Sequence, residues 1–173
     1  MPRLILLNGP PACGKSTLAR MFADRHPLAL DLDIDRVRDL LGAWRDHAGP
    51  AGLLARDIAL AAARTHLTSG YDVIVPQLLA RPRFIEQAEA LAAELGCAFH
   101  EIVLIDSRED ALRRFVLRDG EGVLDPAELA AMYDRLTALM ATRPAVRFVH
   151  SHEGEIERTY AEFSSVLERA EER

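Results

Sequence analysis

GPPACGKST occupies residues 9–17 and directly follows the run LILLN at residues 4–8. It fits the pattern G-x-x-x-x-G-K-[ST], at a place where a strand is expected to lead into a helix. Glycines in this pattern let the backbone curl so that N–H groups point inward, and the N-terminus of the following helix adds partial positive charge. Given this context, the stretch predicts a phosphate-binding loop rather than an ordinary tight turn.

The individual positions of this loop have expected roles. Lys15 can reach the outer phosphates of a nucleotide, and the Ser16 hydroxyl can bind a Mg²⁺ ion that bridges them. Lys15 is the only lysine among the 21 Lys and Arg residues of the chain, and the planar fork of arginine does not imitate its compact ammonium. The residues predicted to bind ATP are Gly9, Pro10, Pro11, Ala12, Cys13, Gly14, Lys15, Ser16 and Thr17.

The rest of the chain reads as short apolar strands that alternate with amphipathic helices. Strands are expected at residues 4–8, 28–33, 71–75, 98–105 and 146–149. This alternation predicts an α/β protein with the P-loop NTPase fold, a five-stranded parallel sheet with helices on both faces. Residues 44–52 read as an irregular polar stretch. No repeat or linker divides the chain, so we expect a single domain over residues 1–173.

Three aspartates alternate at the end of the second expected strand, beside the phosphate loop. They are Asp31, Asp33 and Asp35. A carboxylate there can accept the proton of a hydroxyl that receives a phosphoryl group. Two of the three can flank the acceptor and the Mg²⁺, and Asp33 is the metal candidate together with Ser16. The alternative is a helix cap plus solvated charge.

Two further residues at this edge are candidates for binding the acceptor. Arg38 lies one turn after Asp35 on the same helix face, where it can bind an anionic or polar group or form a surface ion pair. Gln77 follows the third strand, which ends without the acidic residue of a second metal-binding motif. Gln77 can orient a hydroxyl or cap a turn, and both interpretations stay open.

Arginines crowd the helix that precedes a glycine-bearing break at residues 119–122. Transphosphorylation develops negative charge on the equatorial phosphoryl oxygens, which arginines on a mobile flap can neutralise. Arg114 and Arg118 are four residues apart and share a helix face, so we predict that this pair belongs to a lid at about residues 114–125. The alternative is an ordinary basic helix surface.

Composition limits the possible functions and surroundings. The formal net charge is −6, which argues against a broad nucleic-acid-binding face but allows a local basic groove. Only Cys13 and Cys97 are present, so no disulfide framework is expected and a reduced, cytoplasmic setting is the default. The chain enters its first strand at once and its apolar runs are short, so neither a signal peptide nor a membrane span is expected.

Three elements together resemble a known group of enzymes. They are Gly9-x-x-x-x-Gly14-Lys15-Ser16-Thr17, Asp33-x-Asp35-x-x-Arg38, and Arg114-x-x-x-Arg118 before a helix with Met132-Tyr133. This combination resembles the kinase module of bacteriophage polynucleotide kinase and is similar to the zeta-toxin and chloramphenicol phosphotransferase branch of P-loop kinases. The resemblance implies ATP and Mg²⁺ as phosphoryl donor. The roles it implies are Lys15 and Ser16 on the phosphates and metal, Asp35 as general base, Arg38 on the acceptor, and Arg114 and Arg118 as lid arginines. Asp33 is the alternative base.

The leading expectation is therefore an ATP-dependent kinase that phosphorylates a hydroxyl of a small molecule, such as a nucleoside, sugar or antibiotic. A polynucleotide 5′-hydroxyl kinase, acting on a nucleic-acid end, is the alternative enzyme. A regulatory protein that binds ATP without transferring phosphate is the alternative of another class. The acceptor pocket is expected to involve residues 44–52 and the segment after Gln77. The sequence leaves the acceptor and the oligomeric state open.

Overall fold

A computed structural model describes residues 1–119 and 125–171 of the chain. Its strands are β1 (Arg3–Asn8), β2 (Leu30–Asp31), β3 (Val73–Pro76), β4 (Ala98–Ile105) and β5 (Arg147–His150). Its helices are α1 (Lys15–Arg25), α2 (Ile34–Asp39), α3 (Ala48–Thr68), α4 (Pro82–Leu95), α5 (Arg108–Asp119), α6 (Pro126–Ala141) and α7 (Ile156–Glu171), with a 3₁₀ turn η1 at Trp44–His47.

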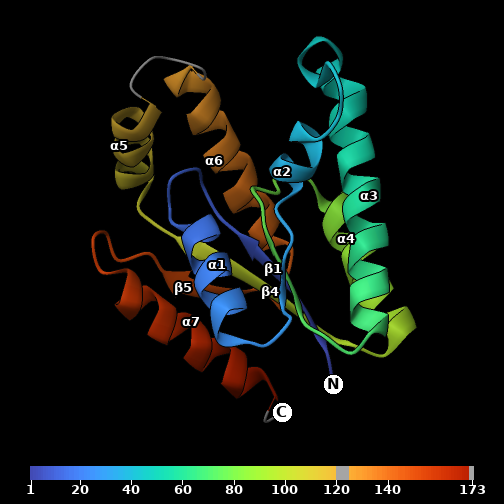
Figure 1. Cartoon of the computed structure of the whole chain (residues 1–173). Coiled ribbons are helices and arrows are strands. Elements are labelled where there is room, and N and C mark those ends of the chain that lie inside the picture. The colour runs from blue at the N-terminus through green and yellow to red at the C-terminus, as the bar shows by residue number, and fades with distance from the viewer. Residues whose placement is uncertain (120–124, 172–173) are drawn as a thin grey trace.

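The five strands form one parallel sheet in the order β2-β3-β1-β4-β5. Helices cover both of its faces (Figure 1). The side chains of the central strand β1 alternate between two cores because successive residues of a strand point to opposite faces. Leu4 and Leu6 pack with α3, α4 and α6, whereas Ile5 and Leu7 pack with α1 and α7. The expected sheet with helices on both faces is confirmed.

Two local expectations are wrong. The second strand is shorter than residues 28–33, because Leu28 has a left-handed backbone (φ +60°) and Asp33 already caps α2. Residues 44–52 are not irregular, because η1 and the first turn of α3 form there. Pro50 lies in that first turn of α3, where the missing N–H of a proline costs no helix hydrogen bond.

The topology opens a crevice at the carboxyl edge of the sheet. β1 and β3 are neighbours, yet β1 continues into α1 on one face and β3 continues into α4 on the other. Adjacent strands whose connections diverge in this way leave a ligand site between their ends. In Figure 1 the loop between β1 and α1 lies at this edge together with α2.

Candidate functional site

The loop after β1 has the curled backbone that its glycines allow. Gly9 has φ +149°, and a Cβ at this position would lie 2.8 Å from the carbonyl oxygen of Leu104 and 3.0 Å from the Cys13 sulfur. Only glycine fits such a close approach to β4. Ala12 (φ +62°) and Gly14 (φ +97°) complete the curl with left-handed backbones. Gly14 is the N-cap of α1 and offers no side-chain cap.

Lys15 folds back over this loop. Its Nζ donates a hydrogen bond to the carbonyl oxygen of Pro10 at 2.7 Å and a weaker one to the Cys13 sulfur at 3.8 Å. The first N–H groups of α1 have no acceptor within the helix, which is true of any helix N-terminus. Ser16 and Thr17 are exposed in the same first turn. The loop therefore combines a positive side chain, free N–H donors and an accessible hydroxyl.

Asn8, at the end of β1, ties the phosphate loop to the loop after β3. Its Oδ1 accepts hydrogen bonds from the N–H groups of Gly9 and Leu79, both at 2.8 Å, and its Nδ2 donates to the carbonyl oxygen of Leu79 at 2.8 Å. Asn8 is fully buried. Sequence reasoning missed this residue; the only signal was a polar side chain at the end of an otherwise apolar strand.

Ser151, in the loop between β5 and α7, ties that loop to the other side of the phosphate loop. Its Oγ donates to the carbonyl oxygen of Cys13 at 2.8 Å. Arg114 from α5 donates to the Ser151 Oγ at 2.9 Å and pairs with Asp106 Oδ2 at 3.1 Å. Burial raises the pKa of Asp106, while the Arg114 guanidinium opposes that shift. Asp106 and Ser151 were not among the sequence-predicted residues.

A pocket of about 370 Å³ lies between the phosphate loop and the β5–α7 loop. Ala12 to Gly14 form one wall, and Arg114 and Leu117 of α5 contribute to another. The remaining lining residues are Ser151, His152, Glu153, Gly154, Ile156 and Thr159. Polar groups that are tied to the phosphate loop thus surround a space next to it.

Asp35, in the first turn of α2, pairs with Arg38 in the last turn of this short helix. The Asp35 carboxylate lies 3.0 Å from Arg38 Nη1, and about half of the Asp35 side chain (53%) is exposed. The Arg38 guanidinium also stacks over the Trp44 ring, 4.3 Å from its centroid. The ion pair that the sequence offered as an alternative for Arg38 is therefore present.

Asp33 caps α2. Its Oδ1 accepts hydrogen bonds from the N–H groups of Asp35 at 2.9 Å and Arg36 at 3.4 Å. Asp33 Oδ2 lies 3.8 Å from Arg36 Nε, and 15% of the Asp33 side chain is exposed. The helix-cap interpretation of the sequence thus describes what Asp33 does here.

Gln77 follows β3 directly. Its backbone N–H donates to the carbonyl oxygen of Leu7 at 3.1 Å. The side-chain Oε1 is buried and has no hydrogen-bond partner within the described part of the chain. The Gln77 backbone therefore extends the contact between the ends of β1 and β3.

The expected lid lies partly outside the described residues. Arg114 is placed as given above, with 11% of its side chain exposed. Arg118 lies in α5. Residues 120–124 of the expected lid lie outside the part of the chain that the structure describes.

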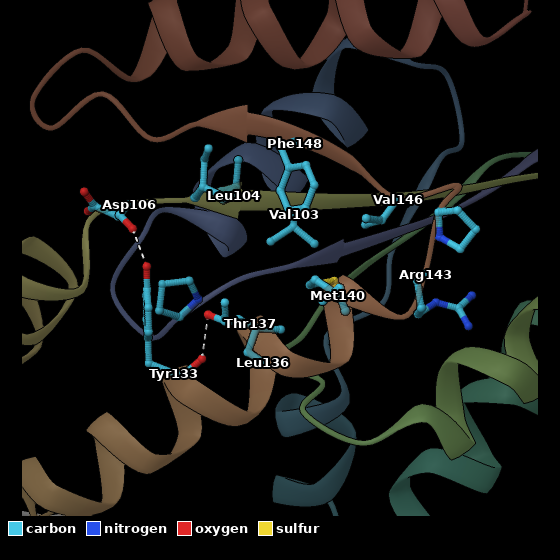
Figure 2. Close-up of a pocket in the computed structure, with 14 residues that line it drawn as sticks. Val103, Leu104, Asp106, Tyr133, Leu136, Thr137, Met140, Arg143, Val146 and Phe148 are labelled. Atoms are coloured by element: carbon cyan, nitrogen blue, oxygen red, sulfur yellow. Dashed lines mark hydrogen bonds between the residues drawn. The ribbon is translucent and has the colours of Figure 1, made fainter.

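A second cavity, of about 480 Å³, lies between α6 and the strands β4 and β5 (Figure 2). Its lining is mostly apolar, with Leu136 and Met140 of α6 facing Val103 and Phe148 of the sheet. Tyr133, in the same lining, donates to the Asp106 carbonyl oxygen at 2.7 Å. This lining offers few groups that bind phosphate, so we do not place the nucleotide there.

The described residues contain neither a membrane-spanning helix nor a cluster of metal ligands. No helix among them is both long and apolar enough to span a bilayer. Nor do their His, Cys, Asp and Glu side chains form any group of three or more that could hold a metal ion.

Comparisons with known proteins support the fold described above. Residues 4–139 match the profile of a family described as AAA domain. A proposed kinase from Chloroflexus aurantiacus has a similar structure (TM-score 0.71, 22% identity, covering 98% of this chain and 97% of that one). A gluconokinase from Sinorhizobium meliloti gives a TM-score of 0.66 at 18% identity, with 97% and 95% covered. A tunicamycin resistance protein from Deinococcus radiodurans gives 0.64 at 18%, with 96% of each chain covered.

No curated protein matches the sequence. At these identities the solved structures show the fold alone. They confirm the P-loop NTPase fold that the sequence predicts.

Proposed function

We propose that this chain, which belongs to the family described as AAA domain, transfers the γ-phosphate of ATP to a hydroxyl of a small molecule. The observation that carries this proposal is that Lys15 and Asp35 lie at the same edge of the sheet. The curled loop after β1 presents the ammonium, and α2 presents a half-exposed carboxylate at the same edge of the sheet. Phosphoryl transfer to an alcohol needs a cation on the outer phosphates and a carboxylate beside the attacking hydroxyl.

The nucleotide is proposed to bind with its phosphates in the loop over residues 9–17. Lys15 exchanges the Pro10 carbonyl for a phosphate oxygen, and the free N–H groups at the start of α1 bind the others. The adenine ring of ATP then occupies the pocket beside Ser151, where Leu117 and Ile156 provide apolar surface for it. This arrangement is supported by the direct hydrogen bond from Ser151 to the loop.

The residues at the start of α1 also suit Mg²⁺. This ion keeps several waters and needs only one or two protein ligands beside the substrate phosphates. Ser16 offers an exposed hydroxyl there, and Asp33 is the second candidate through Oδ2, because Oδ1 is engaged as a helix cap. When bound, Mg²⁺ neutralises charge on the phosphate oxygens.

The chemical step assigned to this chain is a proton transfer coupled to attack on phosphorus. The Asp35 carboxylate takes the proton of the acceptor hydroxyl, and the acceptor oxygen forms a bond to the γ-phosphorus while the bond to the β-phosphate oxygen breaks. ADP leaves with the electron pair of that bond. Arg38 holds Asp35 in place from its position on Trp44 and is proposed to bind a polar group of the acceptor.

Arg114 and Arg118 are proposed as the arginines that neutralise the transferred group. Arg114 already lines the pocket next to the phosphate loop, where Asp106 and Ser151 hold its guanidinium. A single domain over residues 1–173, with a lid at about residues 114–125, is part of the same proposal.

ADP release tests the proposal. Protein with Mg²⁺ and ATP is supplied in turn with nucleosides, sugars, antibiotics and a 5′-hydroxyl oligonucleotide, and Lys15→Met serves as the inactive reference. We expect ADP release that depends on a small alcohol and is lost in the variant. Tight ATP binding without acceptor-dependent release would favour the regulatory alternative, and efficient phosphorylation of the oligonucleotide would favour the polynucleotide kinase.

A further inference from the structure

A third pocket opens at the carboxyl edge, between the first turns of α3, the start of α4 and the middle of α6. Its volume is about 450 Å³. Leu78 to Arg81, in the loop after β3, form part of its wall, and Leu79 is the residue that Asn8 binds. The pocket therefore adjoins the end of β1 on the side away from the nucleotide pocket.

Four arginines line this pocket. They are Arg56, Arg81, Arg83 and Arg135, and the only acid in the lining is Asp57. Among the side chains that the structure describes, no carboxylate lies within 4 Å of any of these four guanidinium groups. Arg56 is positioned instead by a backbone carbonyl, because its Nη1 donates to Gly52 at 2.9 Å.

This cluster differs from the way arginines are used elsewhere in the molecule. Most of the other described arginines pair with an acid, as Arg64 does with Glu94 and Arg143 with Glu101. The protein carries a net charge of −6, so acids are plentiful. Unpaired like charges around one pocket repel each other, and a bound anion would relieve that repulsion.

The start of α4 adds to the positive potential. Arg81 is its N-cap and makes no side-chain cap hydrogen bond, and the first turn contains no acidic residue. The first N–H groups of this 14-residue helix therefore face the region of Arg81 and Arg83 without a capping partner. The N-terminus of α4 and the arginines both favour an anionic ligand.

We infer that the acceptor is a small alcohol that carries a separate anionic group, a phosphate or a carboxylate, which these arginines bind. This inference rests on the proposed function, because it assigns the pocket to the acceptor of that reaction. The remaining lining is largely apolar, from Leu53, Leu78, Phe84 and Met132, and suits the carbon skeleton of the acceptor. The volume fits a small molecule, and the overall negative charge opposes a long polyanion.

Anion binding can be measured without knowing the substrate. The phosphate loop is filled with Mg²⁺ and AMP-PNP, and thermal unfolding is followed as inorganic phosphate is added at constant ionic strength. We expect phosphate to stabilise the nucleotide-filled wild type. Arg83→Gln and Arg135→Gln should raise the phosphate concentration needed for half of this effect about 10-fold or more, which corresponds to a lost charge-assisted hydrogen bond.

A control variant distinguishes phosphate binding in the pocket from a general effect of removing one positive charge. Arg169 is an exposed arginine in the last turn of α7, on the opposite face of the sheet, and no described acid pairs with it. Arg169→Gln should leave the phosphate titration unchanged. Equal titrations for wild type and both pocket variants would overturn the inference, as would the absence of any phosphate effect on the nucleotide-filled wild type.

Matched acceptors test the same idea through turnover. The pairs are glycerol 3-phosphate with glycerol, glycerate with glycerol, and a nucleoside 3′-phosphate with its nucleoside, and a 5′-hydroxyl oligonucleotide is added as a long polyanion. We expect ADP release to favour the anionic member, with the pocket variants raising its KM and leaving kcat nearly unchanged. Equal use of neutral members, or preference for the oligonucleotide, would contradict the inference.

Failure of the proposed function has a different signature. In that case AMP-PNP does not stabilise the protein, or ATP binds and no alcohol releases ADP. The phosphate titration of wild type against Arg135→Gln still reports on the arginine pocket under those conditions, because it requires no turnover.

Discussion

The Asn8 side chain and the Leu79 backbone exchange two hydrogen bonds, each 2.8 Å long. One amide thereby fixes the loop after β3 against the end of β1, and its oxygen also accepts from the N–H of Gly9. The same buried side chain thus contacts both the phosphate loop and the wall of the arginine pocket, the pocket lined by Arg56, Arg81, Arg83 and Arg135. This contact couples the proposed donor and acceptor sides of the site.

Asn8→Ala should lower the free energy of unfolding by about 1–3 kcal/mol, because the N–H and carbonyl of Leu79 lose their buried partner. Urea denaturation measures this change. Thr137→Ala removes an exposed hydrogen bond to the Tyr133 carbonyl and is the control, with a loss below about 1 kcal/mol. Equal losses for the two variants would show that Asn8 is not a buried clamp.

Gly9→Ala should destabilise the fold and prevent ATP binding. The added Cβ would lie 2.8 Å from the Leu104 carbonyl oxygen, at a backbone φ that disfavours side chains. Gly49, in the first turn of α3, has nothing within 4 Å of an added Cβ. Gly49→Ala should therefore keep or slightly increase stability. Thermal unfolding with and without ATP distinguishes the two, and a stable, ATP-binding Gly9→Ala protein would contradict the geometry.

Lys15→Met should leave folding nearly intact, because both hydrogen bonds of the ammonium stay within its own loop, to the Pro10 carbonyl and the Cys13 sulfur. ADP release should fall by about 100-fold or more, since a charge aimed at the transferred phosphoryl group is lost. Lys15→Arg should not restore activity, because the guanidinium cannot occupy the same space on the same stem. Comparable ADP release by wild type and Lys15→Met would remove Lys15 from the reaction.

Substitutions of Asp35 and Asp33 show which of the two carboxylates accepts the proton of the acceptor hydroxyl. Asp35→Asn should reduce ADP release by about 10²–10⁴-fold and leave ATP affinity unchanged. Asp33→Ser keeps a capping oxygen and should retain stability, whereas Asp33→Ala should lose about 1 kcal/mol. If Asp33→Ser abolishes turnover while Asp35→Asn does not, Asp33 is the base.

Asp31 should make stability depend on pH. Burial raises its pKa above the usual value near 3.8, and the nearby Arg36 only partly opposes this. The folded chain then binds a proton that the unfolded chain has lost, so the free energy of unfolding falls as pH rises from about 4 through the raised pKa. Asp31→Asn abolishes this titration, so its stability relative to wild type should increase over that window and then level off. Parallel curves for the two proteins would contradict the shift.

The phosphate loop and the sheet were predictable because their signals are local. The loop pattern depends on glycines within six residues, and β1 and β3 are built on continuous apolar runs. The exact extent of β2 was not predictable, because the left-handed Leu28 carries no signal in its residue type. The start of α3 was missed because Gly49, Pro50 and Gly52 resemble a loop, although a proline in the first turn is compatible with a helix.

The arginine pocket and the Asn8 clamp could not be found from sequence. Arg56, Arg81 and Arg135 lie on three different helices or their caps, and only the packing of α3, α4 and α6 brings them together. Asn8 and Leu79 are separated by 71 residues, and neither belongs to a periodic pattern. Such contacts follow from strand order, which the sequence pattern leaves undetermined.

A crystal structure with Mg²⁺ and AMP-PNP tests the central claim most directly. We predict that Lys15 Nζ leaves the Pro10 carbonyl for the terminal phosphates, while the Asp35 carboxylate lies on the far side of the γ-phosphate with room for an alcohol between them. A nucleotide bound outside residues 9–17, or Lys15 still bound to Pro10 with Asp35 directed away from the γ-phosphate, would contradict the account.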